Sequence, residues 1–185
     1  LYGGSIKGKM YSNVKSVPLW MNEGLAEYLA SSWDVNSDMW LRDLAINSNQ
    51  MPPINMLNGY LAYRGGQSVW KFITEKWGEE SIAEIFYVIA NLYSTQEDYQ
   101  LSNFYLKISL FLNQKFLPNK ALLAENFYYQ KKYKLSKKIY EELKSIGPTY
   151  SWHASKSIST ILLEEKGKEY SIKSLEKDFN FISKT

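Results

Sequence analysis

Two glutamates four residues apart, Glu23 and Glu27, are the residues whose type and spacing best suit chemistry. They lie between Pro18 and Ala30, a run that predicts a helix because proline is favoured in a first helical turn. Residues four apart share one face of a helix, so the two carboxylates stack one turn above the other. Their like charges repel, and Gly24 between them costs about 1 kcal/mol relative to alanine. Two unfavourable choices side by side indicate a role other than helix stability.

A metal site would explain this pattern. One carboxylate would coordinate the cation, and the other would accept the ring N–H of a coordinating histidine and fix its tautomer. The alternative is that both glutamates belong to a solvated helix face. The chain has no cysteine and a single histidine, His153, so it cannot by itself complete a zinc site built from two or three imidazoles or from thiolates. We expect His153 to be an ordinary surface or inter-repeat histidine.

The composition is that of a globular chain able to bury a core, with 45% hydrophobic and 22% charged residues among 185. A net charge of +3 is too balanced to form an electrostatic footprint for nucleic acid or anionic lipid. No apolar run reaches the ~18–20 residues that a membrane helix needs. We therefore expect no nucleic-acid partner and no membrane span in this segment.

Helix signals recur along the chain, whereas strand patterns are hard to find, and the predicted fold class is all-α. Beyond the first helix, the predicted helices cover 38–47, with Asp34 or Ser37 as cap, then 60–77, which Gly78 stops, and 79–93. Composition changes near residue 78: the methionines and both arginines precede it, and most lysines follow it. The predicted domains are therefore 1–82 and 83–185.

The second domain repeats at the sequence level. Gln96–Ser102 matches Gln130–Ser136 at an offset of 34 residues, and Ser171 follows Ser136 by 35. This period, with small and aromatic residues at matching positions, resembles the tetratricopeptide repeat, a helix–turn–helix unit that stacks on its neighbours. The resemblance implies three units, 83–116, 117–149 and 150–185, and peptide or protein segments as partners on the repeat surface.

The first domain also resembles a known family. The segments Pro18–Tyr28, Asp38–Asp43 and Tyr63–Gln67 are similar to the C-terminal side of gluzincin zinc metallopeptidases, and more narrowly to extracytoplasmic bacterial members. In that family a His-Glu-x-x-His helix is followed by a glutamate ligand on a second helix. The fold expected here is accordingly the helical C-terminal lobe of such a peptidase, and the location expected for its parent is extracytoplasmic or periplasmic.

The resemblance also assigns site residues. It implies that Glu23 is the third zinc ligand, that Glu27 is the carboxylate that orients a ligating histidine, and that the reaction is peptide-bond hydrolysis. By its position, Tyr63, or alternatively Tyr60, would donate a hydrogen bond to the developing oxyanion. Aromatic core packing is the other interpretation of these two tyrosines.

The His-Glu-x-x-His motif itself does not occur in the 185 residues. Because the chain starts at Leu1, we expect the motif to be encoded upstream and domain 1–82 to be truncated. The 185-residue chain alone is then expected to bind no zinc tightly and to be catalytically inactive. Exposed apolar surface is then expected around Trp20, Met21 and Leu25, where the missing part would pack. The alternative is a non-catalytic tetratricopeptide scaffold with a peptidase-like remnant as its N-terminal cap.

Overall fold

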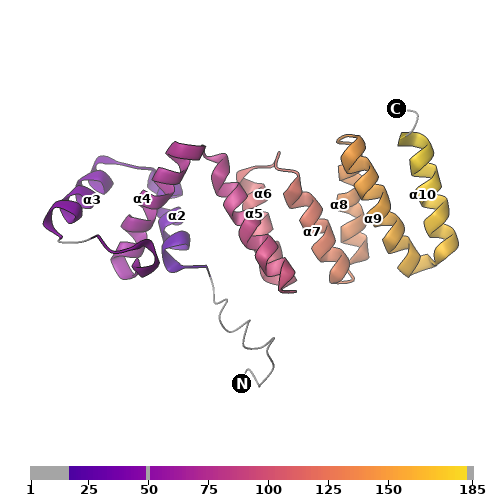
Figure 1. The fold of residues 1–185 in the computed structure, drawn as a ribbon, viewed down its shortest axis with the longest axis horizontal. Coiled ribbons are helices and arrows are strands. Elements are labelled where there is room, and N and C mark those ends of the chain that lie inside the picture. The colour runs from indigo at the N-terminus through magenta and orange to yellow at the C-terminus, as the bar shows by residue number, and fades with distance from the viewer. Residues whose placement is uncertain (1–16, 49–50, 183–185) are drawn as a thin grey trace, which may run out of the picture. The chain divides into compact units, whose positions relative to one another are not determined.

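The computed structural model describes residues 17–48 and 51–182, and every regular element within them is a helix, which confirms the all-α prediction (Figure 1). In chain order the elements are α2 (Leu19–Ser31), α3 (Val35–Asn47), the short 3₁₀ helix η1 (Ile54–Met56), α4 (Gly59–Trp77), α5 (Glu80–Thr95), α6 (Tyr99–Leu112), α7 (Pro118–Tyr129), α8 (Tyr133–Lys144), α9 (Pro148–Lys166) and α10 (Lys168–Ile182). Within the described ranges, no helix is both long and apolar enough to cross a membrane.

The chain divides into two compact units, unit 1 from Leu1 to Ile82 and unit 2 from Ala83 to Thr185. The division falls inside α5, so a single helix runs from one unit into the other. Parts of the predicted domain 1–82, namely residues 1–16 and 49–50, lie outside the described residues, as do residues 183–185 of the last predicted unit.

The crossing of α2 and α4 organises unit 1. Gly24 of α2 and Gly66 of α4 are both buried where the helices meet. A Cβ atom added to Gly66 would lie 2.3 Å from the carbonyl oxygen of Trp20, and one added to Gly24 would lie 2.3 Å from the carbonyl carbon of Gly66. The two backbones therefore touch, which residues with a side chain would prevent. Close helix packing explains why α2 retains a glycine that lowers its intrinsic stability.

Helix α4 covers the side of α2 that carries Leu25, so the prediction of exposed apolar surface is wrong for Leu25, whereas Leu19 and Leu29 of the same helix are 49% and 54% exposed. Leu25 is only 7% exposed, and Trp20 and Met21 are partly buried. Trp70, at the centre of α4, is fully buried; its indole N–H donates to the carbonyl oxygen of Met21 at 3.0 Å, and its ring lies 6.4 Å from that of Trp20. The glycine crossing brings α4 close enough to bury this face.

Apolar side chains are also exposed on α3. Val35, Met39 and Ile46 are 78%, 64% and 79% exposed. The helix also begins one turn earlier than predicted, because the carboxylate of Asp34 accepts a hydrogen bond from the Ser37 amide at 2.7 Å and caps it.

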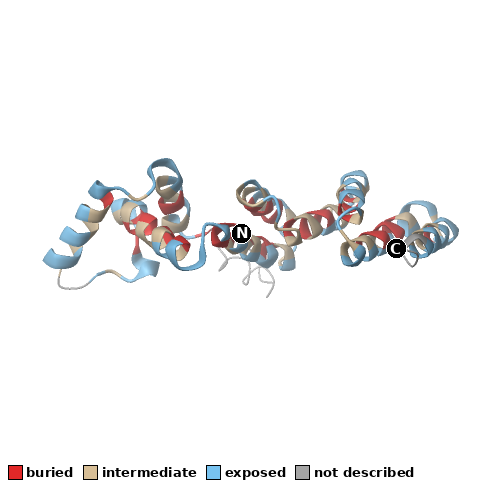
Figure 2. Ribbon diagram, turned by 90° about the horizontal axis from the view of Figure 1, so that it is seen from above, coloured by how far each residue is buried: buried red, intermediate tan, exposed pale blue. Residues whose placement is uncertain are grey.

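In its described part, unit 2 is built from the helical hairpins α5–α6, α7–α8 and α9–α10. Buried residues, red in Figure 2, lie on the faces that neighbouring helices turn toward one another. A cluster of buried residues joins α7, α8 and α9, and its members are Ala124, Tyr140, Leu143, Ala154, Ile158 and Ile161. Apolar burial of this kind supplies the main stabilisation of such stacked helices.

Matching contacts recur within the hairpins. The hydroxyl of Ser136 donates to the carbonyl oxygen of Ala124 at 2.8 Å, and that of Ser171 donates to the carbonyl oxygen of Ser159 at 2.9 Å. Each bond joins residues twelve apart, and each small side chain lets its two helices approach closely. The buried Ser102 occupies the matching position of the first hairpin, where its hydroxyl accepts from the Asn126 side chain at 2.7 Å.

The turns inside the first two hairpins also match. The amide of Asp98 donates to the Tyr93 carbonyl at 3.0 Å, and that of Lys132 to the Phe127 carbonyl at 2.8 Å. Both turns are Schellman motifs, which place one residue in the left-handed region, usually a glycine. That residue is Glu97 in the first hairpin, with φ 64°, and Lys131 in the second, with φ 58°.

Replacing Lys131 with glycine should stabilise the protein relative to Lys131→Ala by about 1 kcal/mol, because a Cβ atom is disfavoured at positive φ. Both substitutions remove the same charge, so the difference between them isolates the backbone effect. Urea unfolding followed by circular dichroism measures it. Equal stability of the two variants, or a more stable alanine variant, would contradict the left-handed turn.

Candidate functional site

Glu23 and Glu27 lie on the α2 face that meets α4, and both are partly buried. Glu27 pairs with Arg64 of α4, with 3.5 Å between the carboxylate oxygen and the guanidinium nitrogen. Their side chains are 35% and 27% exposed, so the pair lies at the edge of the α2–α4 contact rather than in its centre. Glu27 is thereby held in place by a residue of the neighbouring helix.

Tyr63, one residue before Arg64, lies next to Glu23. The pKa of the Tyr63 phenol is raised, first by the negative charge of Glu23, then by loss of solvent, by a hydrogen bond to Glu23 and by the charge of Glu27. The structure therefore places Glu23, Glu27 and Tyr63 together. The Tyr63 residue remains 36% exposed.

Tyr60, the alternative to Tyr63, has a different environment. Its hydroxyl accepts a hydrogen bond from the Nε atom of Arg64 at 3.4 Å, and its ring packs edge-on against Trp40 of α3 with 5.3 Å between centroids. This hydrogen bond makes the largest contribution to the raised pKa of Arg64, and the negative charge of Glu27 raises it further. Tyr60 thus supports Arg64 and the α3–α4 contact.

A buried polar network centred on Gln67 joins α2, α3 and α4. Its amide oxygen accepts from Ser37 at 3.1 Å and from Arg64 at 3.2 Å, and its amide nitrogen donates to the Ser32 carbonyl. Arg64 also donates to the Ser37 hydroxyl at 3.2 Å. Gln67 is fully buried, so each of these bonds replaces one that water would make.

Sequence reasoning missed this network, although a signal for it exists. Gln67 lies on the stripe of α4 that also includes Ala62, Gly66 and Trp70, all of them buried. A polar side chain within such a stripe must find partners on neighbouring elements, because an unpaired buried amide is costly. The network fixes the Arg64 side chain, and Arg64 in turn holds Glu27.

Zinc in proteins takes four ligands from imidazole, thiolate and carboxylate groups. Unit 1 offers the Glu23 carboxylate, and Glu27 is engaged by Arg64. Among the described residues, no group of three or more histidine, cysteine, aspartate or glutamate side chains could hold a metal ion. His153, the single histidine, belongs to unit 2, where it lines a small pocket. The donors of this chain therefore do not fit zinc by themselves.

Comparison of the chain with protein-family models, with curated proteins and with solved structures finds no match. The two family resemblances accordingly depend on the sequence segments that carry them.

Proposed function

We infer that unit 1 contributes the glutamate ligand of a zinc peptidase site and that unit 2 is a tetratricopeptide-like module that holds a peptide or protein segment. The observation that carries the first part is the grouping of Glu23 with Tyr63, and of Glu27 with Arg64, along the α2–α4 contact. A partly exposed carboxylate backed by a fixed neighbour is the arrangement that a metal ligand needs.

The two remaining ligands, both histidines, and the general base would come from residues outside this sequence, because its one histidine lies in unit 2. The chain of 185 residues alone should then bind no zinc tightly and hydrolyse no peptide. Stoichiometric zinc on this chain, with hydrolysis that Glu23→Ala abolishes, would refute this assignment.

The activity test uses the full product of the gene, assayed on a fluorescent generic protein substrate. Glu23→Gln should lower kcat/KM by at least about a thousandfold, comparable to the loss of a main catalytic group. Glu75→Gln, which changes an exposed glutamate of α4 that pairs with Lys71, should leave the rate unchanged. Activity that survives Glu23→Gln would exclude the ligand role.

A second candidate function is that of a non-catalytic interaction scaffold, which the recurring Ser136 and Ser171 contacts of unit 2 favour. The sequence upstream of Leu1 separates the two candidates. A start codon without a His-Glu-x-x-His motif in the preceding few tens of residues would leave the scaffold as the function of the chain.

A further inference from the structure

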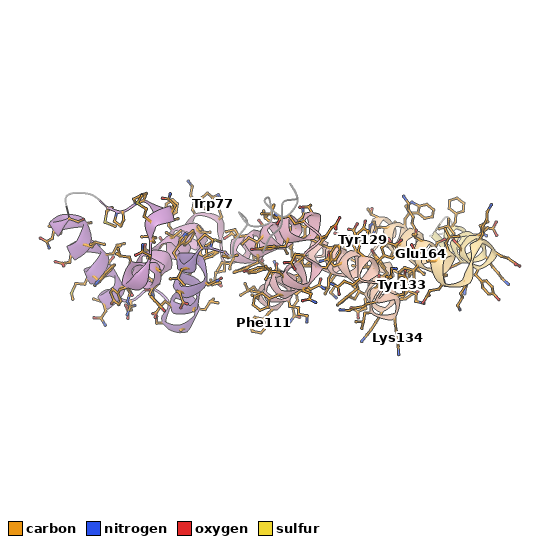
Figure 3. All side chains as sticks on the ribbon, turned by 90° about the horizontal axis from the view of Figure 1, so that it is seen from below. Trp77, Phe111, Tyr129, Tyr133, Lys134 and Glu164 are labelled. Carbon is orange, nitrogen blue, oxygen red and sulfur yellow. The ribbon has the colours of Figure 1, made fainter. Side chains whose placement is uncertain are left out.

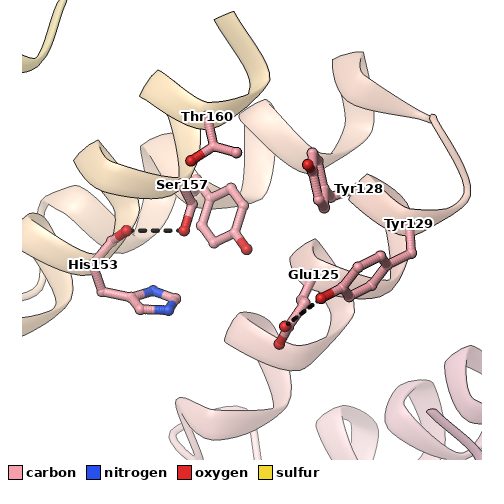
Figure 4. Close-up of a pocket in the computed structure, with 7 residues that line it drawn as sticks. Glu125, Tyr128, Tyr129, His153, Ser157 and Thr160 are labelled. Atoms are coloured by element: carbon pink, nitrogen blue, oxygen red, sulfur yellow. Dashed lines mark hydrogen bonds between the residues drawn. The ribbon is translucent and has the colours of Figure 1, made fainter. Parts of the chain in front are cut away.

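Unit 2 contains a pocket of about 170 Å³ between α7, α8 and α9 (Figure 4). A volume of this size equals roughly six molecules of liquid water and is smaller than the usual site for a small-molecule ligand. It suits one side chain of a bound peptide. In Figure 4, Glu125 and Tyr129 of α7 form one wall, and His153, Ser157 and Thr160 of α9 form the other.

Three of the hydrogen-bonding groups of this pocket, on Ser157, Thr160 and Glu125, can act as acceptors. The hydroxyl of Ser157 donates its proton to the His153 carbonyl at 3.0 Å, and that of Thr160 donates to the Lys156 carbonyl at 3.1 Å. A hydroxyl whose proton is already donated still has lone pairs to offer. The Glu125 carboxylate is an acceptor as well, so a ligand that brings several N–H donors would match the lining.

The carboxylate of Glu125 is also the only negative charge in this lining. Its one side-chain partner in the described part of the chain is the Tyr129 hydroxyl at 3.5 Å, and no lysine or arginine pairs with it there. No lysine or arginine lines the pocket either.

Two other acidic residues of unit 2 differ in this respect. Glu142 pairs with Lys120 at 3.4 Å, and Glu165 pairs with Lys137 at 2.5 Å. Glu164 and Tyr133 lie close together in unit 2 (Figure 3). Glu164 accepts from the hydroxyls of Tyr128 and Tyr133, and these bonds lower the pKa of Glu164 and raise that of Tyr128 to about 12. Glu125 is thus left to attract a positive charge from a partner.

Tyrosine rings supply the remaining lining. Tyr140 is 3% exposed and lies 5.9 Å from the His153 ring, while the Tyr129 ring is held by stacking on Tyr99 of α6 at 5.6 Å. Aromatic faces attract cations within about 6 Å, and a planar guanidinium can both stack on a ring and form a bidentate pair with a carboxylate. Fixed rings beside an unpaired carboxylate therefore favour arginine over lysine.

We propose that the pocket formed by Glu125, Tyr129, Tyr140 and His153 binds an arginine side chain of a partner peptide. This assignment rests on the proposed role of unit 2 as an interaction module and names the side chain that the module selects. Lysine should bind more weakly, because its ammonium neither stacks nor pairs bidentately.

The test uses nuclear magnetic resonance of the 185-residue chain titrated with the capped peptide acetyl-Gly-Arg-Gly-amide, with citrulline or lysine in place of arginine as comparisons. Citrulline keeps the shape of arginine and removes its charge. The arginine peptide should shift the amide signals of α7 and α9 with a Kd of about 1 mM. The citrulline peptide should bind at least about tenfold more weakly, which corresponds to the contribution of one cation–aromatic contact.

Glu125→Gln should weaken arginine binding about tenfold, and Tyr129→Leu should weaken it severalfold. Both side chains are exposed, so the fold should be retained. Glu142→Gln, which removes a carboxylate of α8 away from the pocket lining, is the matched control and should bind as the wild type does.

Equal shifts with arginine and citrulline, arginine binding unchanged in Glu125→Gln, or no shift up to about 10 mM peptide would each overturn the assignment. Peptide binding elsewhere on unit 2 that does not depend on Glu125 would overturn the pocket alone and leave the interaction-module proposal standing. The interaction-module proposal itself would be contradicted only if none of the three peptides shifted any amide signal of unit 2.

Discussion

Replacing Gly24 or Gly66 with alanine should destabilise unit 1 by at least about 3 kcal/mol. In an exposed helix, glycine to alanine stabilises by up to about 1 kcal/mol, so the expected sign is reversed here. The reversal follows from the 2.3 Å that would separate each new Cβ atom from backbone atoms of the facing helix. Backbone atoms cannot rotate away, so α2 and α4 would have to separate and expose Trp70.

Gly65→Ala is the matched control, since it lies on the same helix next to Gly66. Its Cβ atom would meet the side chain of Leu57 at 3.1 Å, which can shift to another rotamer. We expect this variant to lie within about 1 kcal/mol of the wild type. Urea unfolding followed by tryptophan fluorescence reports on Trp20 and Trp70 at the crossing. Similar stability of all three alanine variants would show that the helices are not in backbone contact.

Replacing Gln67 with leucine should cost about 2–4 kcal/mol, the second largest effect. Leucine keeps most of the volume but removes the partner of Ser37, of Arg64 and of the Ser32 carbonyl. The polar groups buried around it would be left unpaired, so the full cost of their desolvation would lower the free energy of unfolding. Chemical denaturation of the variant measures this loss.

A double-mutant cycle with Ser37→Ala gives the sharper test of the network. Ser37 donates to Gln67 at 3.1 Å and is itself 1% exposed, so the two losses should not add. We expect the double variant to be about 1 kcal/mol more stable than the sum of the single effects. Strict additivity would mean that Gln67 and Ser37 act independently, contrary to the hydrogen-bonded network.

The helices of this fold could be predicted from local signals. Asp34 and Gly78 each mark a helix boundary in the structure, through the chemistry that the sequence interpretation used, whereas Pro18 precedes the first helix as its N-cap residue and does not lie in the first turn. The 34-residue offset, with small and aromatic residues at matching positions, indicated hairpins in the second half. The boundary signals act within a few residues and the repeat period is visible in the sequence itself, which is why both can be read without the tertiary structure.

Tertiary contacts could not be predicted in the same way. Gly24 was interpreted as a sign of chemistry, whereas its environment is a helix crossing with a residue 42 positions later, Gly66. The proximity of Glu23 and Tyr63 was expected only through the family resemblance, and the Gln67 network was not anticipated at all. These relations depend on how helices dock, and one sequence does not reveal docking.

Unit 2 shows the same limit. The sequence predicts an ordinary surface or inter-repeat position for His153. The structure places His153 beside Tyr140 and opposite Glu125, around a pocket that the sequence does not predict. Its residues come from α7, α8 and α9, so their proximity follows from stacking two hairpins.

The most direct test of the proposed function is the zinc content of the full gene product and of its glutamate variants. The wild-type protein should retain zinc in stoichiometric amount, and Glu27→Gln should weaken zinc binding by about 10–100-fold, as expected for a carboxylate that orients a ligand. Glu23→Ala should lose the metal on dialysis, and Glu75→Gln should retain it. Zinc bound to Glu23→Ala with wild-type affinity would contradict the assignment of Glu23 as a ligand.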